Sequence, residues 1–221
     1  MIKGIIFDHD GTLVDSERVH FEIWRDVLRS YSTELNRDDY IRHHAGVPTD
    51  KNAERMVKDF DLAISAAELT ATKLAAARAH LDNTAFPLYP DTHEAVALSY
   101  SAGMKMGIAT GAGRVEIDSS LDSHQLRSYF GAISTRDDVK SGKPAPDVYL
   151  QCAQMLKLKA KDCIAIEDSR TGVESALAAG MEVIVIANDF SALQDLSRAT
   201  YSASSLREAV VIALTKKGPY D

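Results

Sequence analysis

The sequence has few cysteines, no excess of basic residues and no long apolar run. Its 221 residues include two cysteines, Cys152 and Cys163, which match neither a metal-binding spacing nor a disulfide framework. The formal net charge of −7 argues against nucleic acid as a general partner, because binding phosphates requires surplus Lys and Arg. No segment has the length of a membrane-spanning helix, and Asp8 and Asp10 interrupt any apolar segment that could serve as a signal peptide. We therefore expect a cytoplasmic protein with reduced thiols and neither a membrane nor a nucleic acid as partner.

Apolar segments that suit buried strands alternate with segments that suit helices. The composition, 45% hydrophobic and 26% charged, is typical of globular proteins. Strands are predicted at residues 5–7, 104–109, 131–134, 163–166 and 183–186. Helices are predicted at residues 91–102, 114–121, 146–156, 171–179 and 205–215. This alternation predicts a doubly wound parallel sheet of the α/β class, with right-handed crossovers.

The first strand is separated from the others by a segment with helical patterns alone. Apolar residues recur at helical spacing from His20 to Tyr31, and a second helix is predicted from Thr49 to Phe60. Ser65 and Glu68 have the spacing of a capping box before an Ala-rich helix. We therefore predict an α-helical bundle of residues 16–82, inserted into an α/β core formed by residues 1–15 and 83–221.

Two acids follow the first predicted strand. Asp8 and Asp10 lie one residue apart and precede Gly11, where the chain turns off the strand. In open parallel sheets, ligands bind beyond the carboxyl ends of the strands. Two carboxylates placed there repel each other unless a cation or a proton joins them. The same residues are also common in ordinary turns and helix caps, so these three positions alone leave both interpretations open.

Other predicted strand ends carry polar residues as well. Thr110 suits either the binding of an anionic oxygen or the capping of a helix. Lys143, in a stiff Gly-Lys-Pro context, suits either a phosphate contact or a solvated surface. Glu167 and Asp168 follow a buried strand and offer the hard oxygen ligands that suit Mg²⁺.

These motifs together resemble the haloacid dehalogenase superfamily. The resemblance rests on Asp-x-Asp-Gly-Thr at residues 8–12, the strand-terminal Thr110, Gly-Lys-Pro-Ala-Pro-Asp at 142–147 and Glu-Asp-Ser-x-x-Gly at 167–172. It covers essentially the whole chain and is closest to the phosphatase and β-phosphoglucomutase-like branch. It implies a Rossmann-like core with a helical cap.

The resemblance also implies catalytic roles. Asp8 would be the nucleophile that forms an aspartyl-phosphate, and Asp10 the general acid and then the general base. Thr110 and Lys143 would bind the transferring phosphoryl group, with Gly11 and Gly111 as further phosphate-binding positions. An acid at Asp10 favours phosphoryl transfer over dehalogenation, because a carbon–halogen bond releases a group that needs no proton.

The resemblance implies one Mg²⁺ ion as cofactor. Asp8, Asp10 and Asp168 would hold it, Asp10 also through its main-chain carbonyl. Glu167 would be a direct or water-mediated ligand.

The helical segment would close over the site, exclude water and supply specificity. His20 would either couple this closure to Asp10 or be an ordinary packed histidine. The segment Ala45-Gly46-Val47-Pro48-Thr49 resembles the specificity loop of the family, with Gly46 and Val47 as substrate-binding positions. β-Phosphoglucomutases have an arginine where this chain has Thr49, which argues against mutase activity. Nearby basic residues could compensate or be solvated: Arg42, His43, His44 and Lys51.

The sequence therefore predicts a Mg²⁺-dependent phosphatase that acts on a small phosphorylated metabolite, such as a sugar or polyol phosphate. The alternatives are a phosphosugar mutase, a catalytically idle binding protein on the same fold, and a dehalogenase. We expect a monomer or a weak homodimer.

Overall fold

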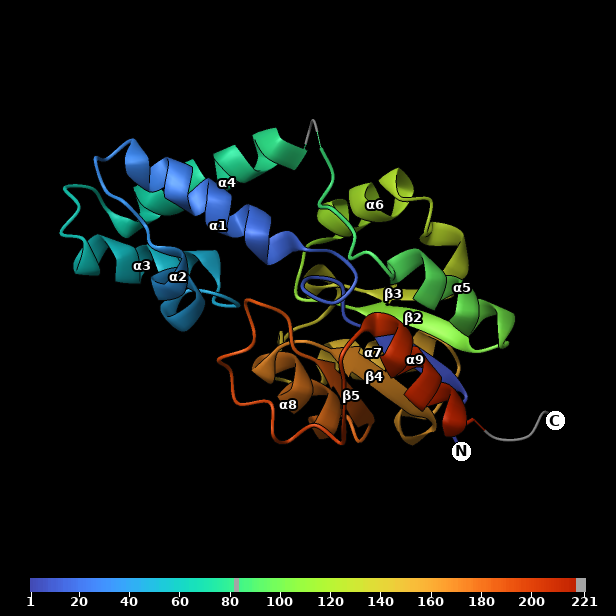
Figure 1. Cartoon of the computed structure of the whole chain (residues 1–221). Helices are drawn as coiled ribbons and strands as arrows, with labels where there is room; N and C mark the ends of the chain where they lie inside the picture. Colours follow the sequence, from blue (N-terminus) through green and yellow to red (C-terminus); the bar gives the residue numbers. More distant parts are fainter. Residues whose placement is uncertain (82–83, 218–221) are drawn as a thin grey trace. The chain divides into compact units, whose positions relative to one another are not determined.

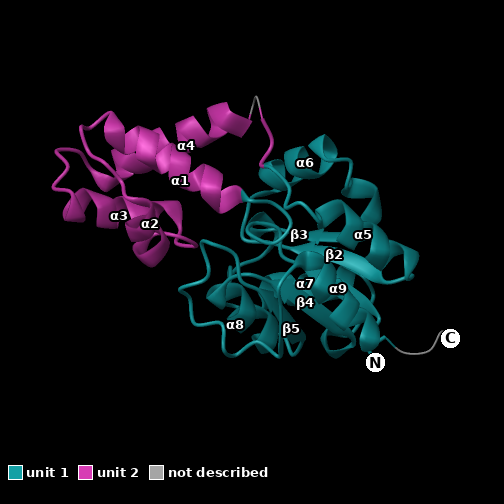
Figure 2. Cartoon of the chain, viewed as in Figure 1, with its two compact units in different colours: residues 1–15, 87–221 teal, residues 16–86 magenta. Residues whose placement is uncertain are grey.

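The computed structural model describes residues 1–81 and 84–217 and divides into two compact units. The α/β unit comprises Met1–Asp15 and the chain from Pro87 onward, and the helical unit comprises Ser16–Phe86 (Figure 2). The predicted boundary between residues 82 and 83 lies outside the described residues. The Asp15 amide donates a hydrogen bond to the Pro87 carbonyl over 2.8 Å, so the chain leaves and re-enters the α/β unit at one point.

The described part of the α/β unit forms a parallel sheet in the order β3-β2-β1-β4-β5-β6 (Figure 1). The predicted doubly wound parallel sheet is confirmed. Its strands are β1 (Gly4–Phe7), β2 (Lys105–Ala109), β3 (Ala132–Ser134), β4 (Cys163–Glu167), β5 (Glu182–Ile186) and β6 (Tyr201–Ala203). The short strand β6 was not predicted, because its residues are half-buried or exposed and lack an apolar run.

Helices cover both faces of the sheet because successive strand side chains point to opposite faces. Ile5 and Phe7 pack in one apolar cluster, whereas Ile6 packs in the other. Burying each of these side chains stabilises the fold by about 1.5–3 kcal/mol. The first cluster includes side chains of α5 (Thr92–Ser101), α6 (Arg114–Ser123) and α9 (Leu206–Thr215). The second includes side chains of α7 (Asp147–Met155) and α8 (Arg170–Ala178).

Short 3-10 helices lie in the connections at Arg127–Tyr129, Arg136–Asp138 and Ala160–Asp162. The Asp91 carboxylate does not cap its own helix α5; it accepts a hydrogen bond of 2.8 Å from the amide of Arg207, in the first turn of α9. Val211 of α9 is 41% exposed, whereas Ala209 and Ala213 lie on the buried face of this helix.

The helical unit contains α1 (Ser16–Arg29), α2 (Arg37–His43), α3 (Thr49–Asp59) and α4 (Ala66–Leu81). Its interior is built from large buried side chains, among them Trp24, Leu28, Tyr40, Met56 and Leu69. The predicted capping box is present: the Glu68 amide donates to Ser65 Oγ, and the Ser65 amide donates to the Glu68 carboxylate. Helix α2 was not predicted, because it is short and buries only Tyr40. Within the described residues, no helix combines the length and apolar character needed to cross a membrane.

Candidate active site

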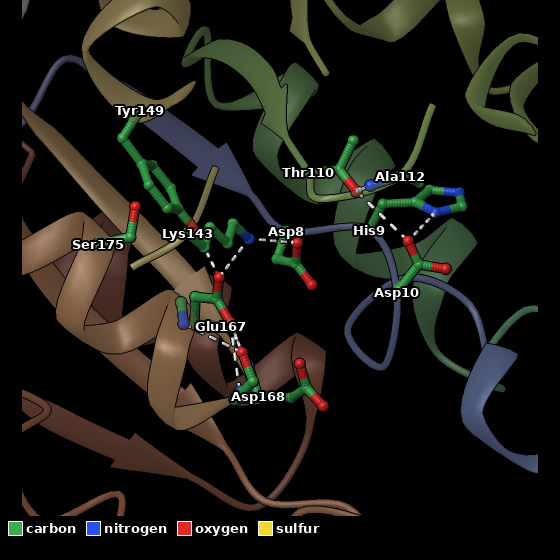
Figure 3. A network of polar contacts seen from close by, with 12 residues as sticks. Asp8, His9, Asp10, Thr110, Ala112, Lys143, Tyr149, Glu167, Asp168 and Ser175 are labelled. Atoms are coloured by element: carbon green, nitrogen blue, oxygen red, sulfur yellow. Dashed lines mark hydrogen bonds and ion pairs between the residues drawn. The ribbon is translucent and has the colours of Figure 1, made fainter. Parts of the chain in front are cut away.

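The polar residues at the strand ends gather where the strand order of the sheet reverses, on either side of β1. Asp8 directly follows β1, Thr110 directly follows β2, and Glu167 is the last residue of β4. Lys143 comes from the connection between β3 and α7. In Figure 3, Asp8 lies between the pair Lys143–Glu167 and the pair Asp10–Thr110. The sheet therefore brings these predicted site residues to one edge.

Lys143 links two buried carboxylates. Its Nζ atom lies 2.6 Å from Asp8 Oδ1 and 2.6 Å from Glu167 Oε1. Burial by itself would lower the pKa of Lys143, but the two carboxylates outweigh burial and raise the pKa above its ordinary value. Lys143 is therefore a fixed positive charge beside Asp8.

Asp8 is a poorly solvated carboxylate. Only 4% of the residue is exposed, and burial raises its pKa to about 7; Lys143 opposes this rise, while Glu167 and Asp10 add to it. A cation at the other Asp8 oxygen would favour the charged form of this group.

Asp8, Glu167 and Asp168 form a carboxylate cluster, in which one oxygen of each residue lies within 4.8 Å of the others. Asp168 can take its place in this cluster only because residue 11 is glycine. Gly11 has a φ of 81°, and a Cβ at this position would lie 2.2 Å from Asp168 Oδ2. Hard carboxylate oxygens at this spacing fit a Mg²⁺ ion. Gly11 thus allows a close approach to Asp168, and its predicted contact with phosphate stays a prediction.

Asn188 supports this cluster and was missed in the sequence. Its Nδ2 group donates to the Gly11 carbonyl over 3.0 Å and to Asp168 Oδ2 over 2.8 Å. Asn188 follows β5, so the same strand-end rule that identified Asp8 could have identified it.

Glu167 is fully buried and accepts hydrogen bonds on both carboxylate oxygens. Oε1 accepts from Lys143 and, over 2.7 Å, from the hydroxyl of Tyr149. Oε2 accepts from the amides of Asp168 and Ser169 and from Ser169 Oγ. These bonds fix the carboxylate and leave it little capacity for a metal ion. Tyr149 was not predicted as a site residue, since nothing in its pattern separates it from an ordinary helix residue. Ser169 belongs to the predicted Glu-Asp-Ser-x-x-Gly motif but was given no role of its own.

The Asp10 carboxylate turns toward β2. Its Oδ2 atom accepts a hydrogen bond of 3.3 Å from Thr110 Oγ1 and lies 3.5 Å from His9 Nδ1. Thr110 Oγ1 also accepts from the Ala112 amide over 3.0 Å. Among the described residues, Asp10 does not belong to the carboxylate cluster. Its predicted metal contact through the main-chain carbonyl stays a prediction.

Gly111 is exposed, and a Cβ placed there would meet nothing within 4 Å among the described residues. The space around Gly111 therefore does not require glycine. Its predicted contact with phosphate is untested by this geometry.

The family model described as haloacid dehalogenase-like hydrolase matches residues 5–186, which include the helical unit and the strand-end residues from Asp8 to Asp168 but not Asn188. The chain belongs to the haloacid dehalogenase-like hydrolase family. The predicted resemblance is confirmed.

Relatives of this haloacid dehalogenase-like hydrolase include named phosphatases. Fructose-1-phosphate phosphatase YqaB of Escherichia coli K12 is 33% identical over 181 residues, which cover 82% of this chain and 94% of that protein. Hexitol phosphatase B of the same strain is 32% identical, with 84% and 83% covered. A solved HAD family hydrolase of Deinococcus radiodurans R1 with bound phosphate and sodium is 25% identical, with a TM-score of 0.79 and 96% of each chain covered. The named relatives support phosphatase activity for this chain.

Predicted substrate-binding residues of this hydrolase also lie in the helical unit. His20 packs edge-on against Phe86, and its Nδ1 atom lies 3.5 Å from Nζ of Lys73. Lys73 is buried and donates to Thr49 Oγ1 over 3.2 Å. Lys73 was missed because it lies in an Ala-rich helix without a recognisable motif. The role of His20 toward a substrate stays a prediction.

The predicted specificity loop is held within the helical unit. The Gly46 amide donates to Glu17 Oε1 over 3.3 Å, and Gly46 has a φ of 70°. The Val47 carbonyl accepts from Asn52 Nδ2 over 3.2 Å. These bonds give the loop a defined shape, and the contacts of Gly46 and Val47 with a substrate stay predictions.

Proposed function

We propose that this protein is a Mg²⁺-dependent phosphatase that hydrolyses a small sugar or polyol phosphate through an aspartyl-phosphate on Asp8. The observation that carries this proposal is the buried Asp8 carboxylate, which Lys143 holds at 2.6 Å inside a cluster of acids. The names of the relatives, fructose-1-phosphate phosphatase and hexitol phosphatase, support the substrate class.

In the first step, an Asp8 oxygen attacks the phosphorus atom of the ester. The bond from phosphorus to the ester oxygen breaks, and Asp10 gives its proton to that oxygen, so the leaving group departs as an alcohol. Lys143 keeps Asp8 oriented and offers positive charge to the transferring phosphoryl group. The products of this step are the alcohol, an aspartyl-phosphate and the Asp10 carboxylate.

In the second step, the Asp10 carboxylate takes a proton from a water molecule while the water oxygen attacks phosphorus. The bond from phosphorus to Asp8 breaks, and inorganic phosphate leaves. Asp10 is then protonated again and Asp8 is again a carboxylate, so the residues return to their starting state.

Asp8 and Asp168, with the main-chain carbonyl of Asp10, would hold the Mg²⁺ ion. Glu167 would act mainly by orienting Lys143 and the backbone around Asp168, because its oxygens already accept hydrogen bonds. When bound, the ion would offset the repulsion between the Asp8 carboxylate and the phosphate, and would stabilise charge in the transition state.

A phosphosugar mutase is the second candidate, because buried Lys73 donates to Thr49. A cation therefore lies next to the position where β-phosphoglucomutases have an arginine. Supplying β-glucose 1-phosphate with a bisphosphate primer separates the candidates. Isomerisation without release of free phosphate would replace the phosphatase proposal by the mutase.

The phosphatase proposal is tested by measuring phosphate release from a panel of sugar and polyol phosphates, with and without Mg²⁺. We expect Mg²⁺-dependent release, and we expect Asp8→Asn to abolish it because an amide cannot attack phosphorus. Exposed Asp59→Asn is the matched control, and circular dichroism checks that both variants fold. If the protein released no phosphate from any ester, a catalytically idle binding protein would be the better description. Near wild-type turnover by Asp8→Asn would contradict the proposed nucleophile.

A further inference from the structure

His9 separates the two acids of the first motif and is itself buried, with 1% of the residue exposed. Neither step of the proposed reaction uses this side chain. Its backbone is held in place, because the His9 carbonyl accepts hydrogen bonds from three amides of the following turn, those of Thr12, Leu13 and Val14. These hydrogen bonds fix the backbone position from which the His9 ring extends, beside Asp8 and Asp10.

The two ring nitrogens of His9 have different surroundings. Nε2 lies 2.9 Å from the hydroxyl oxygen of Ser120, a buried residue of α6. Nδ1 is buried, lies 3.5 Å from Asp10 Oδ2 and has no partner within hydrogen-bonding distance among the described residues. Figure 3 shows the ring of His9 directed toward the Asp10 carboxylate.

A neutral imidazole carries one N–H group, and the hydrogen bond at one nitrogen decides the role of the other. The Ser120 hydroxyl can donate to Nε2, which leaves the N–H group on Nδ1. That N–H group faces the oxygen of Asp10 that already accepts from Thr110. A buried N–H group without a partner is unfavourable, so a small rotation of Asp10 that closes the 3.5 Å separation is stabilised.

We propose that His9, set by Ser120, is a positioning residue that orients the carboxyl group of Asp10 for proton transfer. This inference rests on the proposed phosphatase function, in which Asp10 is the acid and base. Thr110 donates to one Asp10 oxygen and His9 Nδ1 lies 3.5 Å from the same oxygen, so both side chains favour one orientation of the carboxyl group.

Two variants of His9 separate its two contacts. In His9→Asn, the amide nitrogen occupies the place of Nδ1 and can still donate to Asp10. In His9→Gln, the amide lies one bond farther out, near Ser120, and the donor toward Asp10 is lost. Exposed His93→Gln is the control for the substitution itself. Ser120→Ala removes the contact at Nε2 without changing His9.

The readout is kcat/KM for two esters, because this quantity reports the steps up to the first phosphoryl transfer. An alkyl phosphate needs a proton on its leaving oxygen, whereas p-nitrophenyl phosphate releases a stable phenolate without one. We expect His9→Gln to lower kcat/KM for the alkyl ester by about 10-fold or more and to leave the nitrophenyl ester within about 3-fold. His9→Asn is expected to retain most of the alkyl-ester activity, and Ser120→Ala to show a smaller loss on the alkyl ester alone. Equal losses on both esters, or equal behaviour of the Asn and Gln variants, would overturn the inference.

A second readout does not depend on turnover. The nitrogen chemical shifts of the His9 ring, assigned by comparison with His9→Gln, report which nitrogen carries the proton. We expect the proton on Nδ1, and a shift change at Nδ1 in Asp10→Asn. A proton on Nε2 would overturn the inference even if the phosphatase proposal held. Absence of phosphate release by the wild type would refute the function, and the ring shifts would still decide whether His9 is set toward Asp10.

Discussion

The two units of the molecule bury polar groups in different ways. In the α/β unit, Lys143 lies between the carboxylates of Asp8 and Glu167, so the buried groups carry charge. In the helical unit, His44 Nδ1 lies 2.9 Å from Asn52 Oδ1, and Asn52 Nδ2 donates to the carbonyls of His44 and Val47. A buried charge without a partner destabilises the folded state, and buried charged groups are common in active sites. The hydrogen-bonded side chains of His44 and Asn52 instead fix the shape of a loop. The difference predicts that substitutions in the first unit change turnover and those in the second change stability.

The largest effect is expected for Lys143→Met. The substitution removes the positive charge beside Asp8 and leaves two buried carboxylates facing each other. We expect kcat/KM for a sugar phosphate to fall by about 10²-fold or more, the usual loss for a donor that stabilises a transition state. Steady-state kinetics measure this, with exposed Lys140→Met as the control. Wild-type kinetics for the Lys143 variant would remove the charged group from the proposed mechanism.

A smaller effect is expected for Asn188→Ala. Asn188 holds the Asp168 carboxylate and the Gly11 carbonyl, so its loss lets Asp168 reorient. The Mg²⁺ concentration for half-maximal phosphate release should rise by about 10- to 100-fold, as for other residues that orient metal ligands. Titrations with Mg²⁺ measure this. Asn52→Ala, in the helical unit, is the matched control. An equal rise of this Mg²⁺ concentration in both variants would contradict the proposed difference between the two units.

Asn52→Ala itself should act on stability. The substitution removes the hydrogen bonds that join Asn52 to the carbonyls of His44 and Val47 and to the ring of His44. We expect the free energy of unfolding to fall by about 1–2 kcal/mol, measured by urea denaturation. Alkyl-ester and nitrophenyl-ester turnover should fall by the same factor, if at all. A stability equal to that of the wild type would show that the loop does not need this bond.

The smallest effect concerns pH. Burial lowers the pKa of His44 from its ordinary value of 6.5, and the hydrogen bond with Asn52 only partly offsets this. Below that pH the unfolded chain binds a proton at His44 that the folded chain does not, so the free energy of unfolding falls as pH falls from about 6.5 toward the lower folded pKa. His44→Gln should lessen this fall, as measured by urea denaturation between pH 7 and pH 5. The same substitution at the exposed neighbour His43 is the control, and an unchanged pH dependence in His44→Gln would contradict the assignment.

The sequence predicts the α/β unit better than the helical unit for a physical reason. A buried parallel strand needs a continuous apolar run, and its last residue meets the sheet edge, so Asp8, Thr110 and Glu167 could be placed from sequence alone. Asn188 obeys the same rule but is a common turn residue, and it gave no further signal. Strand β6 has no apolar run, so tertiary contacts and not local pattern define it.

Residues that act through contacts distant in sequence could not be predicted. Tyr149 reaches Glu167 across 18 positions, and Ser120 reaches His9 across 111. Lys73 lies on an Ala-rich helix without a clear apolar face, and the periodicity of the helix that carries Asn52 identifies a buried face but no polar partner on it. Such pairs are fixed by how elements pack, and a single sequence holds no pattern for that packing.

The bond between the Asp15 amide and the Pro87 carbonyl, together with the antiparallel bridge between Val14 and Leu88, brings the two ends of the inserted segment side by side. The chain therefore leaves the α/β unit and returns to it at adjacent positions, as it would if a short turn joined them. The strand connectivity of the α/β unit does not depend on the length or sequence of the inserted segment. Helices of different length or sequence could occupy this place in related chains while the strand-end residues stay where they are, so substrate preference can diverge without rebuilding the chemistry.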